Sequence, residues 1–186
     1  MYLHGIGTEA DETKAEHYLT KASDYGNTHA SYQLARLYIR QESQKLSGES
    51  GTAPDYAKIA KAVKWLEESA AQENPFADYA IGRLYREGTL VVADMEKAIF
   101  HLKRAADAGN SYAQYQLGKI YLEEEIRNIP SAIQYLTLAA KQKNEFAAYR
   151  LGKLYLAGEE LPKNTELALH YLKMAADTGN QYAQYA

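Results

Sequence analysis

The sequence has no cysteine in its 186 residues. Without thiols the chain can form no disulfide bond, no zinc site with thiolate ligands and no cysteine nucleophile. The absence of cysteine fits the reducing environment of the cytoplasm, and we predict a cytoplasmic protein.

Long apolar runs and an excess of one charge are missing as well. No apolar run approaches the roughly 20 residues of a membrane-spanning helix, and the opening Met1-Tyr2-Leu3-His4 lacks the basic and apolar regions of a signal peptide. The 21 basic and 24 acidic residues give a formal net charge of -3. Because neither sign dominates enough to steer the chain to a polyanion or an anionic surface, we expect no membrane partner and no direct nucleic-acid partner.

The patterns that carry catalysis or bind metals and cofactors are also missing. The histidines, at positions 4, 17, 29, 101 and 170, form no i, i+4 pair that would place two metal ligands on one helical face. Glu123-Glu124-Glu125 indicates a solvated helix end, since a metal site or an acid/base pair needs partners from elsewhere in the chain. We therefore predict a protein that is not an enzyme, with no catalytic residue, no metal and no cofactor.

What the sequence has instead is repetition. Aligning the chain with itself brings five alanines into register at spacings of 47, 36, 34 and 36 residues: Ala30, Ala77, Ala113, Ala147 and Ala183. A period of about 36 residues is typical of a solenoid.

Each copy carries two apolar patterns of helical period. In residues 111–144 the first pattern comprises Ala113, Leu117, Ile120 and Tyr121, and the second comprises Ala132, Tyr135, Leu136, Ala139 and Ala140. Neither helix can bury its apolar face alone, so the copies must stack on one another to enclose a core. We predict an all-α chain.

These residues carry a specific resemblance. The pattern Ala113-x-Tyr115-x-Leu117-Gly118-x-x-Tyr121, with segments of the type Lys97-Ala98 and Ala105-Ala106-x-x-Gly109-Asn110, resembles the Sel1-like repeat, a relative of the tetratricopeptide repeat. The resemblance implies a right-handed α/α superhelix of helix-turn-helix repeats that serves as a protein-binding scaffold. It implies no reaction.

The resemblance covers nearly the whole chain. It predicts one array over residues 1–186, with partial repeats at 1–27 and 181–186 and full repeats at 28–74, 75–110, 111–144 and 145–180. Because both ends cut a repeat and neither carries a polar capping unit, we expect an excised piece of a longer bacterial protein.

The predicted turns between repeats fall into two kinds. Three turns combine a glycine that ends one helix with an asparagine that caps the next: Gly26-Asn27, Gly109-Asn110 and Gly179-Asn180. Glu73 and Lys143 stand in place of the glycine at two others. If those turns keep the same left-handed geometry, each loses roughly 1 kcal/mol or more of stability.

A small residue recurs in the first helices, and one copy contains an insertion. A small residue follows Leu or Ile in each first helix, at Ala35, Gly82, Gly118 and Gly152. Since a helical glycine costs about 1 kcal/mol against alanine, its recurrence indicates close approach of a neighbouring helix. The 47-residue spacing requires an insertion, which residues 41–54 supply as a predicted loop, either a tolerated surface insertion or a binding loop.

Two tyrosine stripes follow the first helices. Tyr38, Tyr85, Tyr121 and Tyr155 share the face of the buried aliphatic residues, and we expect them to pack in the core. The second stripe points away from the core of its own hairpin, since at about 100° per residue Tyr32 lies near 200° and Arg36 near 240° from Ala30. It repeats four times, as Tyr32 with Arg36, Tyr79 with Arg83, Tyr115 with Lys119, and Tyr149 with Lys153.

By resemblance to tetratricopeptide arrays, first helices line the concave surface, so the four pairs would form a row of basic and aromatic side chains along a groove. The tyrosines belong to the family pattern, which leaves structural packing as their alternative role. The family pattern does not specify the residue type at the basic positions. These side chains either bind a partner or simply lie on a solvated face of the helix.

Three functions are compatible with this reading. The first is a scaffold whose groove binds a segment of another protein, with Arg36, Arg83, Lys119 and Lys153 contacting its carboxylates. The second is a hydrolase of the kind reported for some Sel1-like proteins, which rests on fold analogy alone. The third is an accessory array of a larger protein, similar to those that follow the relaxase domain in conjugative elements.

Overall fold

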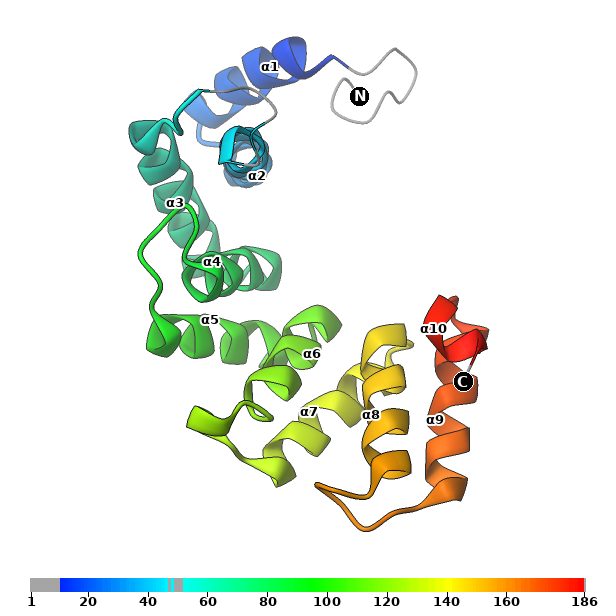
Figure 1. Cartoon of the computed structure of the whole chain (residues 1–186). Coiled ribbons are helices and arrows are strands. Elements are labelled where there is room, and N and C mark those ends of the chain that lie inside the picture. The colour runs from blue at the N-terminus through cyan, green and yellow to red at the C-terminus, as the bar shows by residue number, and fades with distance from the viewer. Residues whose placement is uncertain (1–10, 47, 49–51, 186) are drawn as a thin grey trace. The chain divides into compact units, whose positions relative to one another are not determined.

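The computed structural model describes residues 11–46, 48 and 52–185, and these residues form helices without any strand (Figure 1). The prediction of an all-α chain is therefore confirmed. The helices are α1 (Glu12–Asp24), α2 (Thr28–Leu46), α3 (Tyr56–Ala71), α4 (Pro75–Glu87), α5 (Met95–Asp107), α6 (Ser111–Ile120), the 3-10 helix η1 (Glu124–Ile126), α7 (Ile129–Lys141), α8 (Glu145–Ala157), α9 (Thr165–Asp177) and α10 (Gln181–Gln184). The chain divides into two compact units, Met1–Ala98 and Ile99–Ala186.

Asparagine or aspartate side chains begin the helices. The Asn110 carboxamide oxygen accepts a hydrogen bond from the Ala113 N–H at 3.0 Å, and Asn144 accepts one from Ala147 at 3.1 Å. The same type of bond occurs at Asp11, Asn27, Asp55, Asn74, Asp94, Asn128, Asn164 and Asn180. Each cap satisfies a backbone N–H that no carbonyl of its own helix can reach.

The turns between repeats all use one left-handed residue. Gly26, Gly109 and Gly179 have φ angles of 82°, 88° and 104°, while Glu73 and Lys143 have φ angles of 60° and 61°. The two turns without glycine thus keep the left-handed geometry of the others, the condition under which a loss of stability is expected. Each holds a side chain in a backbone conformation that L-residues avoid.

In the first unit, α2 packs against both α1 and α3, and α3 packs against α4. Leu34, Ile59, Leu66 and Ile81 from these helices are completely or almost completely buried in one apolar cluster. At the edge of the cluster the Tyr38 ring lies 5.7 Å from the Trp65 ring. The expected packing role of Tyr38 is confirmed.

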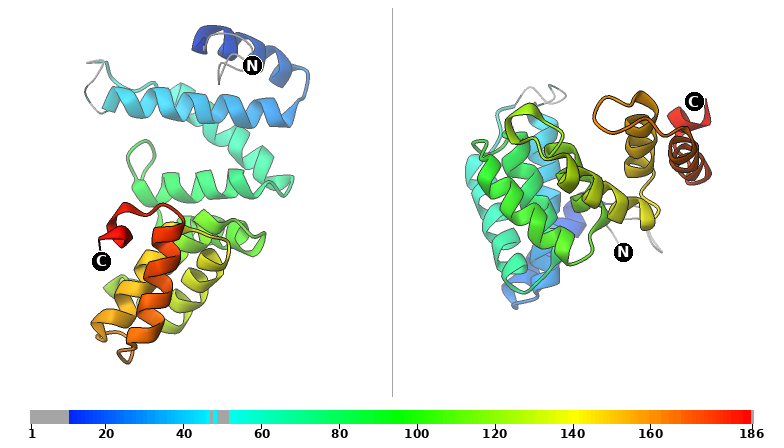
Figure 2. Two further views of the ribbon diagram at one scale, coloured as in Figure 1. Left: turned by 90° about the vertical axis from the view of Figure 1, so that its right-hand side faces the viewer. Right: turned by 90° about the horizontal axis from the view of Figure 1, so that it is seen from below.

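In the second unit, α6 packs against α7, α7 against α8, and α8 against α9. Figure 2 shows α8 and α9 lying alongside each other in both of its views. A Cβ added to Gly118 would lie 2.5 Å from Leu136 Cγ, and one added to Gly152 would lie 2.7 Å from Leu172 Cγ. The close approach predicted from the recurring glycine is therefore present in both of these hairpins.

The tyrosines of the core stripe stack on the second helices of the second unit. Tyr121 stacks on Tyr135 at 5.9 Å between ring centroids, and Tyr155 stacks on Tyr171 at 6.0 Å. Burial raises the pKa of the Tyr135 and Tyr155 hydroxyls from the ordinary value. These contacts confirm that the stripe packs within the hairpins.

The predicted loop at 41–54 is shorter than expected, because α2 continues through Leu46. The residues Gln41 to Leu46 include several good helix formers, which the flexible composition that follows them concealed. Glu42 in this extension is only 1% exposed. Its carboxylate pairs with Lys45 at 2.7 Å and accepts the Asp55 N–H at 2.7 Å, so it joins the end of α2 to the N-cap of α3.

Candidate partner-binding surface

Three of the four predicted tyrosine and cation pairs are in contact. The Arg36 Cζ lies 5.6 Å from the centroid of the Tyr32 ring, and the Arg83 Cζ lies 6.0 Å from that of Tyr79. The Lys119 Nζ lies 5.7 Å from the centroid of the Tyr115 ring. Side chains four residues apart are neighbours on a helix, and a cation over an aromatic face is attracted by the ring quadrupole.

The fourth pair, Tyr149 and Lys153 on α8, is separated. Within residues 11–46, 48 and 52–185, Lys153 makes no cation–π contact with Tyr149 and no ion pair. Its side chain is exposed. Lys153 is therefore exposed to solvent, whereas the Tyr149 ring contacts Tyr182.

Tyr32 differs from the prediction, because it does not line an open surface. Its side chain is only 7% exposed and belongs to the apolar cluster of the first unit. The His29 and Arg36 side chains of the same helix lie against its ring. Burial raises the pKa of the Tyr32 hydroxyl, an effect that the Arg36 charge opposes. Tyr32 therefore packs as a core residue.

Arg83 is exposed but already has an acidic neighbour. Its Nε and Nη2 donate to Glu87 Oε1 at 2.9 and 2.5 Å. Burial acts to lower the pKa of the Arg83 guanidinium, but the hydrogen bonds and charge of Glu87 outweigh it and the pKa is raised. A partner carboxylate at this position would have to compete with Glu87.

In the second unit, aromatic side chains of successive first helices contact one another. The Tyr115 ring on α6 lies 5.9 Å from the Phe146 ring on α8, and the Tyr149 ring on α8 lies 6.2 Å from the Tyr182 ring on α10. Phe146 is 46% exposed and Tyr182 is 74% exposed. We call these four residues the aromatic ladder.

The sequence prediction missed Phe146 and Tyr182, although the signal was present. An aromatic residue precedes the registered alanine in each of the last four copies, at Phe76, Tyr112, Phe146 and Tyr182. All four are among the exposed large hydrophobic side chains. A large aromatic side chain that is exposed at the same register position in four copies is the pattern by which Phe146 and Tyr182 could have been found.

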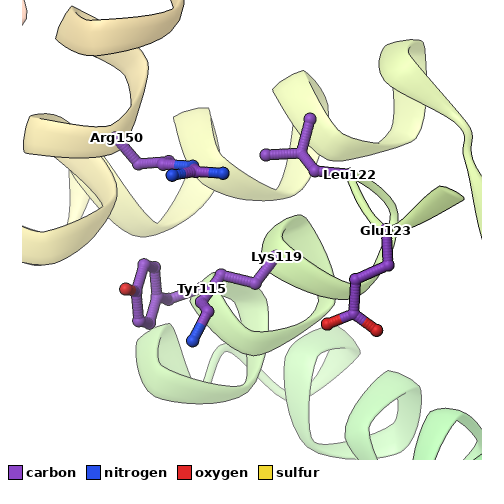
Figure 3. Close-up of a pocket in the computed structure, with 5 residues that line it drawn as sticks. All are labelled: Tyr115, Lys119, Leu122, Glu123 and Arg150. Carbon is purple, nitrogen blue, oxygen red and sulfur yellow. The ribbon is translucent and has the colours of Figure 1, made fainter.

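A small open pocket of about 170 Å³ lies beside the ladder. Tyr115, Lys119, Leu122, Glu123 and Arg150 line it (Figure 3). In the close-up, the Arg150 side chain extends from α8 along one side of the pocket, and Tyr115 and Lys119 lie on the other side. Two of the predicted residues, Tyr115 and Lys119, are thus brought together with a second cation.

Arg150 was not predicted, because its position carries no repeated signal. The residues in register with it are Gln33, Ala80 and Gln116. Its side chain is exposed, and within the described part of the chain it forms no ion pair. Glu123 is half-buried at the pocket, so it departs from the fully solvated helix end expected for the three glutamates, whereas Glu124 and Glu125 are exposed.

The described residues do not bring metal ligands together. No group of three histidine, aspartate or glutamate side chains among them could hold a metal ion. His17, His101 and His170 instead lie edge-on to adjacent aromatic rings, and His4 lies outside the described residues. No helix in the described part of the chain has the length and apolar character needed to cross a membrane.

Comparison with protein families matches the Sel1 repeat at residues 1–27, 28–74, 75–110, 111–144 and 146–180. Among solved structures, the chain is similar to c5321, a protective antigen of uropathogenic Escherichia coli with an SLR fold, at 29% identity and a TM-score of 0.80 over 99% of this chain and 38% of that one. It is similar to a Sel1 repeat protein from Oxalobacter formigenes at 33% identity and a TM-score of 0.75 over 96% of this chain and 49% of that one.

A third similar structure is the immunity protein Pa5087 from Pseudomonas aeruginosa, at 25% identity and a TM-score of 0.58 over 90% of this chain and 59% of that one. The chain spans less than half the length of the first two proteins. The search of curated proteins found no match.

Proposed function

Because this chain belongs to the Sel1 repeat family, we propose that it is a non-catalytic scaffold that binds an acidic segment of another protein along its first helices. Sel1 repeat proteins generally mediate protein–protein interaction. The finer assignment, to the first-helix surface, is carried by one observation. The aromatic ladder of α6, α8 and α10 has two exposed rings, Phe146 and Tyr182, on two half-buried tyrosines, and it lies beside basic side chains.

The ladder supplies the kind of contact area that binding surfaces use. Tyrosine and phenylalanine present large rigid surfaces that lose little conformational entropy on binding, and aromatic residues are enriched among the residues that dominate binding energy. Phe146 and Tyr182 leave large fractions of their rings in water in this chain. Covering them with apolar groups of a partner releases that water.

The basic side chains supply the preference for acid. Lys119, Arg150 and Lys153 lie on α6 and α8 beside the ladder, and Arg36 and Arg83 occupy the corresponding helices of the first unit. Charge complementarity at the rim of an interface mainly raises the association rate and selects the partner. An acidic segment that also carries apolar residues matches both parts of this surface.

A peptide-display selection on the immobilised chain tests the proposal. We expect selected peptides to be enriched in Asp and Glu interspersed with apolar residues. Replacing Arg36, Arg83, Lys119 and Lys153 with Glu should weaken binding of those peptides at least about tenfold, because attractive contacts become repulsive. Fluorescence anisotropy measures the dissociation constants.

A matched control carries the same change of charge elsewhere. Lys64, Lys141, Lys163 and Lys173 are exposed and lie outside the first helices. Their replacement with Glu should leave affinity within about twofold, apart from long-range steering that salt suppresses. Equal weakening by the two sets at 0.5 M salt would contradict the first-helix assignment.

The likeness to an immunity protein favours a second candidate, in which the bound segment belongs to a protein whose toxicity this chain blocks. Fragments of the source genome that arrest growth when expressed would be co-expressed with the chain. Rescue by the chain and loss of rescue in the four-residue Glu variant would support this candidate. If the chain relieves no toxic fragment, the candidate fails while the scaffold proposal stands.

A further inference from the structure

We infer that the pocket between α6 and α8 holds a single acidic side chain, aspartate or glutamate, of the bound segment, with Arg150 as its principal anchor. This inference rests on the proposed function, since it names what one residue of the partner does. The pocket is lined by Tyr115, Lys119, Leu122, Glu123 and Arg150. Arg150 thus combines a cavity with a guanidinium that has no ion pair in the described part of the chain.

The charge of the lining favours an anion. Lys119 and Arg150 contribute two positive charges, and Glu123 contributes one negative charge. The guanidinium extends into the open space of the pocket in Figure 3, away from the ribbon of α8 that carries it. A planar guanidinium can donate two parallel hydrogen bonds to one carboxylate, which lysine cannot do.

Glu123 limits the charge that the pocket accepts. A phosphate group would bring about two negative charges next to this carboxylate at pH 7. Like charges at short range oppose each other, and the repulsion grows with the second charge of the ligand. A carboxylate brings one charge, which matches the net positive charge of the lining.

The position of the pocket favours an internal residue of the partner over its C-terminus. Tyr115 lines the pocket and also contacts Phe146 as part of the aromatic ladder. A segment that runs along the ladder therefore passes the pocket and continues beyond it. The aliphatic carbons of its acidic side chain would contact the Tyr115 ring and Leu122 while the carboxylate reaches Arg150.

The test uses small capped amino acids and the whole chain, so it does not depend on a peptide partner. N-acetylglutamate amide, which has only a side-chain carboxylate, is titrated while the Arg150 Nε–H resonance is followed by NMR, assigned from its loss in Arg150→Gln. We expect a saturable shift. N-acetylglutamine amide, the neutral analogue, should bind at least about tenfold more weakly, because it cannot form charge-assisted hydrogen bonds.

Two further ligands distinguish the sources of the anion. N-acetylglycine carries only a terminal carboxylate, and N-acetylphosphoserine amide carries a phosphate. Tighter binding of N-acetylglycine than of the glutamate derivative would overturn the assignment to a side chain. Tighter binding of the phosphoserine derivative would overturn the preference for a single charge.

Two variants separate the pocket from the general surface. Since the Arg150 side chain is exposed, Arg150→Gln should leave the circular dichroism spectrum unchanged while binding of N-acetylglutamate amide, followed on backbone resonances of α6, is lost. Lys173→Gln removes an exposed cation of α9 outside the pocket and should leave binding unchanged. Binding that survives Arg150→Gln, or that is equal for the glutamate and glutamine derivatives, contradicts the inference. Peptide binding that persists in that case would show that the scaffold proposal holds without the pocket.

Discussion

The α2–α3 hairpin of the first unit and the α6–α7 hairpin of the second share one sequence register but differ at one buried position. Gly118 in α6 lies so close to α7 that an added Cβ would be 2.5 Å from Leu136 Cγ and 3.3 Å from the Ala132 carbonyl oxygen. The position in α2 is Ala35, whose Cβ is present and fully buried. The α2–α3 hairpin therefore has room for a methyl group that the α6–α7 hairpin lacks.

The two hairpins also differ in the length of the first helix. α2 has 19 residues and α6 has 10. The extra length of α2 ends in the buried Glu42, whose hydrogen bond to the Asp55 N–H fixes the start of α3. The repeat register thus decides which face of a helix is buried, whereas helix length and closeness of approach depend on single residues that vary between copies.

The largest expected effect is at the close approach in α6. Gly118→Ala should lower the free energy of unfolding by about 2–3 kcal/mol, because Leu136 must move at its branching carbon and overpacking of a core has this magnitude. Alanine in place of glycine in an ordinary helix interior would instead raise stability by about 1 kcal/mol. Urea unfolding followed by circular dichroism measures the difference.

The matched variant in the first unit is Ala35→Gly. We expect it to lower the free energy of unfolding by about 1 kcal/mol through helix propensity. If Gly118→Ala raised stability, α6 and α7 would not approach as closely as the structure shows. A loss of stability in both variants, where adding a methyl group weakens the α6–α7 hairpin and removing one weakens the α2–α3 hairpin, would strengthen the contrast between the hairpins.

The next effect is at the carboxylate that is specific to the first unit. Glu42→Ala should lower the free energy of unfolding by about 2 kcal/mol, since it leaves the Asp55 N–H and the Lys45 ammonium without their acceptor. The control is Glu87→Ala, which removes an exposed partner of Arg83 and should cost less than about 1 kcal/mol. Similar losses at the two positions would contradict a buried link between α2 and α3.

The pH dependence provides a second readout for Glu42. Burial acts to raise its pKa, but hydrogen bonds from Lys45 and the Asp55 N–H, with the charges of Lys45 and Lys58, outweigh burial and lower the pKa below its ordinary value of 4.5. A lowered folded-state pKa gives stability that is present above the ordinary pKa and is lost as pH falls through the folded value. The stability difference between the native chain and Glu42→Ala should therefore shrink below pH 4.5.

The fold could be predicted largely because its rules are local. The register of alanines and the glycine and asparagine at the turns act within a few residues of the positions they determine. The good helix formers at the end of α2 favoured a longer helix, but the hydrogen bond between the Glu42 carboxylate and the Asp55 N–H, 13 residues away, could not be read from a local pattern. The partner binding of the predicted surface residues remains a proposal.

The candidate site was less predictable for two physical reasons. A helical projection places Tyr32 relative to its own hairpin but contains no information about the other helices that join α2 in the apolar cluster of the first unit. The register position of Arg150 carries an arginine in only one copy, so a search for residues that recur between copies cannot find it. Phe146 and Tyr182 could have been found, since an aromatic recurs at their position in four copies.

The smallest expected effect concerns a feature that the two units share. Glu73 in the first and Lys143 in the second hold left-handed φ angles of 60° and 61°, where the other turns have glycine. Glycine relieves about 1–2 kcal/mol of backbone strain there, but it also increases the entropy of the unfolded chain. Glu73→Gly and Lys143→Gly should each raise the free energy of unfolding by a net gain of about 0.5–1 kcal/mol. The control is Gln134→Gly, at an exposed position inside α7, which should lower the free energy of unfolding by about 1 kcal/mol. If glycine at Glu73 or Lys143 lowered the free energy of unfolding by a similar amount, the left-handed backbone at that turn would carry no strain.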